Sequence, residues 1–134
     1  MTTGAARKVL SAEGTSDPSD HPLLLERVAA VGLEPPEAVL HPANTDEVGD
    51  VMRWANEAGV GVLPLASGAR LRPRREGGAP AGRWVALRAD RLSGIEMYEA
   101  ADLTLTAGAG TSMREVDDAL CANGQWAPFD PPHV

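Results

Sequence analysis

The chain has 134 residues, of which 43% are hydrophobic and only 4% aromatic. This length suits one domain with a core built mainly from aliphatic side chains. The formal net charge of −7 at pH 7 argues against non-specific binding to nucleic acid or to a membrane surface. The single cysteine excludes an internal disulfide, and no apolar run approaches the roughly 20 residues of a membrane helix. We therefore expect a soluble, cytoplasmic protein without membrane insertion.

The first part of the chain predicts an arm, a helix and a strand. Residues 1–20 are rich in Ser, Thr, Gly and Asp and show no period, so we expect a flexible N-terminal arm. A short helix is predicted before Gly32, with Asp20 as its cap and Pro22 in its first turn. Residues 38–41 then read as a short strand.

The strongest helix signal covers about residues 45–58. Asn44 or Thr45 caps it, Glu47 lies three residues after Asn44, and apolar residues recur at helical spacing. Gly59 is a natural C-terminal stop. A strand over residues 60–63 follows at once, and a long loop separates it from another strand over residues 84–87.

The last third predicts a hairpin and a helix. Residues 95–99 and 103–106 are expected to be strands, joined by a turn between them. Ser112 and Glu115 form a capping box for a final helix, which Gly124 closes. The order of elements predicts an α/β (α+β) fold, with a small mixed β-sheet and two or three packed helices.

The loop after the strand at residues 60–63 is the best candidate for a ligand site. Small residues let several backbone N–H groups converge on a phosphate, and Gly68 can adopt a positive φ. Ser67 adds a hydroxyl donor, and Arg70 can offset negative charge. An ordinary strand-to-loop exit is the competing interpretation. The candidate residues are Leu65, Ala66, Ser67, Gly68, Ala69, Arg70 and Leu71.

Positive charge gathers around this loop. Seven of the twelve basic residues are arginines between Arg70 and Arg91, opposed there only by Glu76 and Asp90. This excess on an acidic chain indicates an anionic ligand or partner, and a solvated basic loop is the alternative.

A second glycine-rich turn has a plainer interpretation. Gly108-Ala109-Gly110-Thr111 lacks the third glycine of a dinucleotide fingerprint, because Met113 stands in that position. No Gly-Lys-Ser/Thr follows, as a Walker loop would require. The pattern therefore favours a tight turn that leads into a capped helix.

The remaining reactive residues do not form a recognisable site. The histidines His21, His41 and His133 are dispersed and fit surface or strand-end positions rather than a metal site. Cys121 lies near the apolar stripe of the last helix, which favours core packing over nucleophilic work. No Ser-His-Asp or paired-carboxylate set can be argued from the sequence, so no catalytic residue is assigned.

Several motifs follow one another in a specific order over about residues 36–133. In this order they resemble the FAD-binding domain of the vanillyl-alcohol oxidase and p-cresol methylhydroxylase (PCMH) family. Within that family, the last motif is similar to the FAD-binding subunit of glycolate oxidase (glycolate dehydrogenase). The motifs are His41-Pro42-x-Asn44-Thr45-x-Glu47-Val48, Ala55-Asn56-Glu57-Ala58-Gly59, the Leu63-to-Leu71 loop, Arg91-Leu92-Ser93-Gly94-Ile95, Leu103-Thr104-Leu105-Thr106-Ala107-Gly108-Ala109-Gly110-Thr111 and Phe129-Asp130-Pro131-Pro132-His133.

The resemblance implies a domain organisation and a cofactor. Residues 21–134 would be the first, pyrophosphate-loop subdomain of a PCMH-type domain, with the second subdomain absent. The segment from Leu65 to Leu71 would cradle the FAD diphosphate, and Pro131 would lie near the cofactor. Ala66 and Ser67 stand where glycines are common in the family. The loop contains no histidine, which excludes a histidyl-flavin bond from this segment and implies non-covalent FAD.

The resemblance also implies a reaction and partners. A small 2-hydroxy acid would be oxidised, with hydride passing to the flavin and electrons passing on to an iron–sulfur subunit of a glycolate-oxidase-type complex. The isolated chain is expected to be inactive without the second subdomain. Two alternatives stay open: a non-catalytic binding or assembly module without flavin, and a truncated fragment that keeps the fold.

Overall fold

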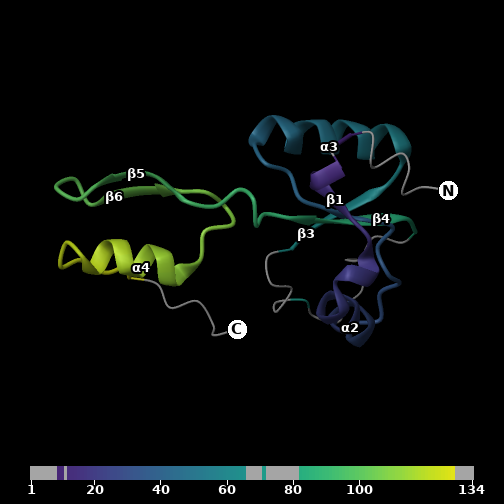
Figure 1. The fold of residues 1–134 in the computed structure, drawn as a ribbon, viewed down its shortest axis with the longest axis horizontal. Helices are drawn as coiled ribbons and strands as arrows, with labels where there is room; N and C mark the ends of the chain where they lie inside the picture. The colour runs from purple at the N-terminus through teal and green to yellow at the C-terminus, as the bar shows by residue number, and fades with distance from the viewer. Residues whose placement is uncertain (1–8, 11, 66–70, 72–81, 129–134) are drawn as a thin grey trace.

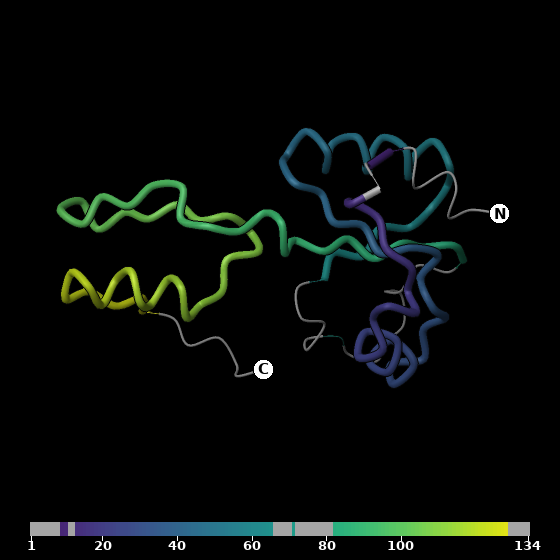
Figure 2. Tube along the Cα trace, viewed as in Figure 1, coloured from purple at the N-terminus to yellow at the C-terminus, as the bar shows by residue number. Residues whose placement is uncertain are grey.

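The computed structural model describes residues 9–10, 12–65, 71 and 82–128. They form two parts arranged along the longest axis of the molecule (Figure 1). The larger part is a four-stranded sheet with a helix on each face, and the smaller is a two-stranded hairpin with one helix beside it. Figure 2 shows the chain passing from the larger part to the smaller after strand β4. The predicted α/β fold with a mixed sheet and packed helices is confirmed.

The larger sheet has the strand order β1-β2-β4-β3. Its strands are β1 (Thr15–Ser16), β2 (Val39–Leu40), β4 (Trp84–Arg88) and β3 (Gly61–Leu65). β4 is parallel to both β2 and β3, and β1 is antiparallel to β2. The three parallel strands therefore end on the same side of the sheet. We call this side the carboxyl edge, and Leu40, Arg88 and Leu65 are the last residues of its strands.

Both faces of β4 are buried, because its first four residues, Trp84 to Leu87, have almost no exposed surface. Successive side chains of a strand point to opposite faces. Val85 and Leu87 pack in the same cluster as Val51 of helix α3 (Thr45–Ala58). The alternate residues of β4 pack with helix α2 (Pro22–Ala30) in a cluster that contains Leu24, Val28, Val39, Leu65, Trp84 and Ala86. The sheet thus separates two cores, and a continuous apolar run is what such a strand requires.

Helix α3 follows the sequence expectation closely. The Asn44 side chain accepts a hydrogen bond from the Glu47 N–H at 2.9 Å, so Asn44 rather than Thr45 is the cap. The Glu47 carboxylate reaches back to the N–H of Ala43 at 2.8 Å, one residue before the cap. Gly59 ends the helix with φ +61° in the left-handed region.

Helix α2 begins differently from the prediction. The expected Asp20 cap is wrong, because Asp20 is the last residue of a short 3₁₀ turn, η2 (Pro18–Asp20). His21 occupies the N-cap position of α2 and makes no side-chain capping bond. Pro22 occupies the first turn, as expected, where a missing N–H removes no helical hydrogen bond.

The N-terminal segment is more ordered than a flexible arm over residues 12–20. A 3₁₀ turn, η1 (Ala12–Gly14), leads into β1, whose two residues pair with β2. Leu10 is buried in the core on the α3 side of the sheet. The order of this segment comes from backbone pairing with β2. Such pairing needs no hydrophobic pattern, so the sequence gives no sign of it. Residues 1–8 and 11 lie outside the described residues.

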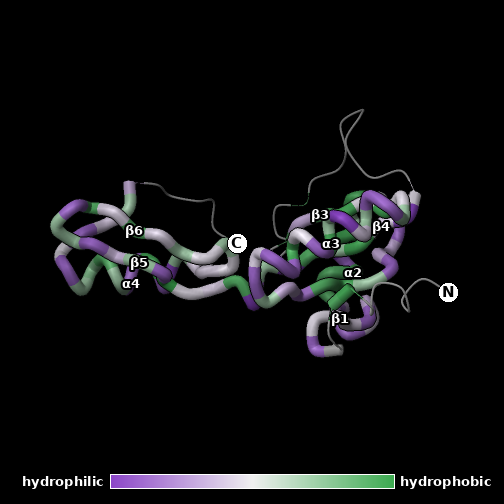
Figure 3. Tube along the Cα trace, turned by 90° about the horizontal axis from the view of Figure 1, so that it is seen from above, coloured by the Kyte–Doolittle hydropathy of each residue, from purple (hydrophilic) through white to green (hydrophobic). Residues whose placement is uncertain are grey.

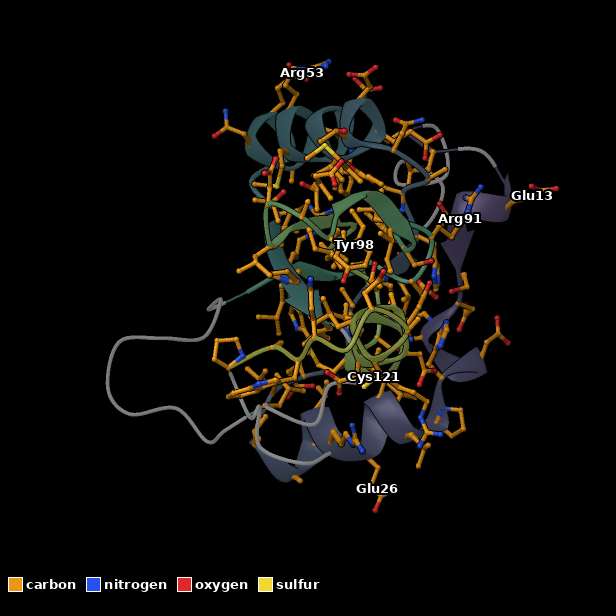
Figure 4. The ribbon with its side chains drawn as sticks, turned by 90° about the vertical axis from the view of Figure 1, so that its left-hand side faces the viewer. Glu13, Glu26, Arg53, Arg91, Tyr98 and Cys121 are labelled. Atoms are coloured by element: carbon orange, nitrogen blue, oxygen red, sulfur yellow. The ribbon has the colours of Figure 1, made fainter. Side chains whose placement is uncertain are left out.

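The smaller part consists of β5 (Ile95–Glu99), β6 (Thr104–Ala107) and helix α4 (Met113–Cys121). The expected hairpin is confirmed, and its turn places Leu103 at φ +56°. Tyr98 donates to the Gln125 side chain at 2.8 Å, and Gln125 donates to the Ala100 carbonyl at 2.7 Å. These two bonds tie the hairpin to the chain that follows α4. Figure 4 shows Tyr98 near the centre of the view, above α4.

The two parts differ in how apolar they are. Figure 3 shows apolar segments concentrated in the larger part, where β4 runs through the centre. None of the five residues of β5 is buried, and Met97 is 56% exposed. The stable core of the described residues therefore belongs to the larger sheet, and the smaller part offers open surface.

Candidate functional site

The carboxyl edge is the place where this fold can hold a ligand. In open sheets of parallel strands, ligands bind beyond the carboxyl ends of the strands, where the loops diverge. Three segments leave the sheet here: the chain after Leu40, the chain after Arg88, and the predicted phosphate loop after Leu65. The carboxyl edge therefore brings the predicted phosphate loop together with residues that follow β2 and β4.

The structure describes only the two ends of the predicted loop. Leu65 is buried as the last residue of β3, and Leu71 packs against the core on the α2 side. Both ends therefore lie on the same side of the sheet. The predicted residues between them, Ala66, Ser67, Gly68, Ala69 and Arg70, lie outside the described residues, as does Pro131.

Arg88 is the basic residue closest to the start of this loop by register. It pairs with Leu65 across the β3–β4 ladder, so the two residues end neighbouring parallel strands. Its Nε atom is buried and has no hydrogen-bond partner within the described residues. One terminal nitrogen lies 3.9 Å from the Asp90 carboxylate, which is a loose ion pair. A planar guanidinium with an unused donor suits an anionic group such as phosphate, whose oxygens accept its N–H bonds.

Arg88 belongs to the arginine-rich stretch of the sequence, but no local motif connects it to the predicted phosphate loop. The alternation of side chains along β4 indicates which face Arg88 belongs to. Arg88 lies two residues after Ala86 and four after Trp84, so it belongs to the same face of the strand as these residues, the α2 side. A charged residue at the last position of a buried strand is exposed to the loops at its end, and this pattern could have identified it.

A second group of polar side chains meets at the same edge. Ser16 Oγ lies 2.7 Å from His21 Nε2 and 2.9 Å from His41 Nε2. His41 Nδ1 lies 2.9 Å from Asp90 Oδ1, and the two imidazole rings stack with centroids 5.5 Å apart. His21 and His41, which are dispersed along the sequence, therefore meet in the structure, and His41 stands at a strand end as expected, directly after β2. We call Ser16, His21, His41 and Asp90 the clasp.

The clasp contains the order of bonds found in a serine-hydrolase triad, from Asp90 through His41 to Ser16. Its carboxylate fixes the His41 proton on Nδ1, which leaves Nε2 of the neutral ring to accept the Ser16 proton. The hydroxyl oxygen then accepts from His21 Nε2. The Ser16 oxygen therefore already holds a hydrogen bond from His21. This geometry favours a structural chain of hydrogen bonds over a serine that is free to act as a nucleophile.

Charge around the clasp shifts two of its groups. Partial burial, followed by the charges of His41 and Arg88, lowers the pKa of His21 from its ordinary 6.5. Partial burial of Asp90 disfavours its charged form, but hydrogen bonding and charge from His41, with Arg88, hold its pKa below the ordinary 3.8. The clasp is therefore arranged for a neutral His21 and an ionised Asp90.

The turn from Gly108 to Gly110 matches its sequence interpretation. Its amides are already bonded: Gly108 N–H donates to the Gly94 carbonyl and Gly110 N–H to the Leu92 carbonyl, each at 2.9 Å. A Cβ at Gly110 would collide with the carbonyl oxygen of Ala89. These glycines allow close backbone packing, and Ser112 then caps α4 through the Glu115 N–H at 3.2 Å.

Other expectations for reactive residues can be compared with the structure. Cys121 is exposed, so the expectation of core packing is wrong: the buried face of α4 is formed by Val116 and Leu120, and Cys121 points away from it. Within the described ranges, no three His, Cys, Asp or Glu side chains gather as a metal site. None of the helices in the described part of the chain has the length and apolar character that crossing a bilayer requires.

Solved structures share this fold. A structure of alkyldihydroxyacetonephosphate synthase covers 90% of the chain with a TM-score of 0.68 and 15% identity. A structure of p-cresol methylhydroxylase with substrate bound covers 92% of the chain with a TM-score of 0.65 and 15% identity. The chain spans 24% of each of those proteins. The fold is therefore that of PCMH-type FAD-binding proteins, of which the chain covers a part.

The sequence comparison narrows this class to a family. A family model described as an FAD binding domain matches residues 36–134, and the chain belongs to this family. D-2-hydroxyglutarate dehydrogenase of Xanthomonas citri pv. viticola is 36% identical over 96 residues, which are 71% of this chain and 20% of that protein. D-lactate dehydrogenase of Archaeoglobus fulgidus is 29% identical over 94 residues, which are 69% of this chain and 20% of that protein. The chain thus spans about a fifth of the length of these curated relatives.

The carboxyl edge fits the cofactor that the family implies. FAD carries a diphosphate, which needs hydrogen-bond donors and positive charge. Arg88 offers a buried Nε donor with no partner among the described residues, beside the last residue of β3. The predicted membership of the PCMH-type FAD-binding family is confirmed.

Proposed function

We propose that this chain supplies the diphosphate-binding part of the FAD site in an oxidoreductase that acts on a small 2-hydroxy acid. The observation that carries the proposal is the carboxyl edge, where the Leu65–Leu71 loop begins beside Arg88 within the region matched as an FAD binding domain. The two curated relatives support the substrate class, because 2-hydroxyglutarate and lactate, which their names contain, are both 2-hydroxy acids.

In this proposal the chain binds and orients the cofactor. Backbone amides of the loop and the Arg88 guanidinium hold the diphosphate, and the α2-side core holds both ends of the loop through Leu65 and Leu71. FAD, when bound, supplies the two-electron acceptor for the oxidation. No residue of this chain is given a catalytic role, since none of the described residues has been placed against a reacting atom.

The finer parts of the proposal rest on the sequence resemblance. They are that FAD is bound non-covalently, that a second subdomain completes its contacts, and that the protein is a glycolate-oxidase-type subunit with an iron–sulfur partner. Pro131-Pro132-His133 supports the glycolate oxidase branch, and Pro131 is proposed to lie near the cofactor. A cytoplasmic location stays a prediction from the sequence.

A binding or assembly module without flavin is the second candidate. The smaller part favours it by exposing apolar side chains: Met97 is 56% exposed, and Leu103 and Trp126 are each 76% exposed. In this reading the same fold serves only to contact another subunit. The two candidates differ in what happens at the carboxyl edge, which makes them separable.

The deciding experiment is a titration of the isotope-labelled chain with FAD or ADP, followed by NMR. We expect amide shifts at Leu65 and Arg88, at the carboxyl edge, and none at Met97 in the smaller part. Gly68→Glu, which adds a negative charge to the loop, should weaken these shifts strongly. Gly78→Glu is the matched control outside the predicted phosphate segment, residues 65–71, and should not. An unchanged carboxyl edge at about 1 mM ligand, where even weak sites fill, would favour the assembly module.

A further inference from the structure

The clasp joins four separate segments at the carboxyl edge. Ser16 belongs to β1, His21 stands at the N-cap of α2, His41 follows β2, and Asp90 lies in the turn after β4. Direct bonds between the four side chains connect all these segments, at 2.7, 2.9 and 2.9 Å along the relay. The Arg91 guanidinium adds a bond of 3.0 Å to the His41 carbonyl. The clasp therefore adds a side-chain connection between the N-terminal segment and this edge to the backbone pairing of β1 with β2.

The number of protons in the clasp decides which atoms donate and how many positive charges meet at Ser16. With both rings neutral, His41 donates to Asp90, Ser16 donates to His41, and His21 donates to Ser16. With one ring charged, the same atoms can still be paired donor to acceptor. With both rings charged, both Nε2–H groups donate to the single Ser16 oxygen, so two positive rings converge on one atom and the hydroxyl proton must turn to an acceptor outside the clasp.

Electrostatic repulsion disfavours the state in which both imidazole rings are charged. Two charged rings would stack at a centroid separation of 5.5 Å, close to the Arg88 guanidinium. Asp20 and Asp90 are the carboxylates that oppose this repulsion, and Asp90 is already engaged by His41. The combined charge of both rings and Arg88 therefore exceeds that of the two carboxylates by one unit.

The strand that the clasp secures is the weakest element of the sheet. β1 has only two residues, and two pairs join it to β2. Short edge elements with few contacts open at a low free-energy cost relative to global unfolding. A loss of the clasp can therefore release β1 while the buried strand β4 stays in place.

We propose that the clasp is a pH-sensitive latch, which releases β1 and the η2 turn from the carboxyl edge when both His21 and His41 are protonated. This device exposes the backbone edge of β2 in acid and covers it near neutral pH. It does not depend on the flavin proposal, because every group that it uses belongs to this chain and none needs a cofactor. Failure of one proposal therefore leaves the other intact.

Hydrogen exchange of the whole chain between about pH 7 and about pH 5 tests the latch. The reporter is the His41 amide, which donates to the Gly14 carbonyl at 2.7 Å, and the internal reference is the Ala86 amide, bonded to Ala38 at 3.0 Å. After correction for intrinsic exchange, protection of the reporter should fall by up to about tenfold per pH unit for one proton taken up on opening. Protection of the reference should stay constant.

Two variants sharpen the test. His21→Gln keeps an N–H donor for Ser16 but cannot become charged, so reporter protection should stay nearly level with pH. His133→Gln removes the third histidine of the sequence and should behave like the unmodified chain. Equal pH slopes in His21→Gln and the unmodified chain would overturn the proposal.

A measurement on the unmodified chain keeps the test decisive if a variant misfolds. The ¹⁵N resonances of the imidazole rings report when each ring becomes charged. We expect the His41 amide to lose protection over the same pH range in which the second ring of the clasp takes up its proton. Charging of both rings without any loss of protection would rule out the latch.

Discussion

His41 donates a hydrogen bond from Nδ1 to Asp90, which lies 49 residues further along the chain, at 2.9 Å. The bond joins the residue after β2 to the turn after β4, so it closes the gap between two neighbouring parallel strands at the carboxyl edge. The His41 side chain is only 12% exposed, whereas that of Asp90 is 44% exposed. The carboxylate therefore holds the imidazole in one tautomer from the solvent side.

Asp90→Asn should lower stability at neutral pH. Asparagine can still accept the His41 proton, so the variant removes the charge and little else. Because the pKa of Asp90 is lowered from 3.8 in the folded state, its contribution is present above that pH and is lost as the pH falls through the folded-state value. We expect a loss of about 0.5–1 kcal/mol at neutral pH, a figure reduced for solvent screening.

Urea unfolding of Asp90→Asn at several pH values measures this loss. The difference from the unmodified chain should shrink as the pH falls below about 3.8, and it should vanish below the lowered folded-state pKa of Asp90, where both chains carry a neutral side chain at this position. Asp102→Asn is the matched control in the exposed hairpin turn, and its effect should stay within about 0.5 kcal/mol. A difference for Asp90→Asn that is independent of pH would contradict the charge argument.

The cap of α3 gives a prediction that separates two adjacent residues. Asn44 Oδ1 bonds the Glu47 N–H, while Thr45 is exposed and already belongs to the helix. Asn44→Ala should cost about 1 kcal/mol of unfolding free energy, whereas Thr45→Ala should be nearly neutral. Thermal or denaturant unfolding of the two variants compares them directly, and equal losses would show that the cap bond does not matter for stability.

The turn before α4 gives the largest expected effect on stability. A Cβ on Gly110 would lie 2.6 Å from the carbonyl carbon of Ala89, closer than real Cβ contacts allow, so backbone has to move. Gly110→Ala should destabilise the chain by about 3 kcal/mol or more. In Gly49→Ala, within α3, the nearest atom is the Arg53 Nη2 at 3.8 Å, which is ordinary contact. This control should stabilise the helix by about 0.5–1 kcal/mol.

The elements that sequence analysis predicted well carry local signals. Asn44 with Glu47, and Ser112 with Glu115, mark helix starts through bonds between residues three apart. The continuous apolar run of β4 marks a strand buried on both faces. Such signals span a few residues, and they are visible without knowledge of the fold.

The parts that sequence analysis missed depend on contacts between distant residues. Ser16 meets His41 across 25 residues, and His41 meets Asp90 across 49, so no spacing rule connects them. β1 is invisible for a similar reason, because backbone pairing with β2 rather than a hydrophobic pattern defines it. Arg88 is an intermediate case: alternation along β4 indicates its side, but only the parallel register with Leu65 places it at the loop.

Arg88→Gln should weaken binding of FAD or ADP without unfolding the chain. The variant removes the charge that we propose for the diphosphate, and charge-assisted hydrogen bonds of this kind contribute about 1.5–3 kcal/mol. We therefore expect the Kd for FAD to rise roughly ten- to a hundredfold, measured by calorimetry or by quenching of flavin fluorescence. Asp90 loses only a loose contact of 3.9 Å, so stability should change little.

Arg53→Gln is the matched control for Arg88→Gln, because Arg53 projects into solvent from the outer face of α3 (Figure 4). It makes the same change in net charge but lies on the helix that covers the opposite face of the sheet from α2. If both variants weakened binding equally, the effect would reflect overall charge rather than a contact. If Arg88→Gln bound FAD as tightly as the unmodified chain, the free Nε of Arg88 would have no part in holding the diphosphate, and the loop amides would have to hold it without this guanidinium.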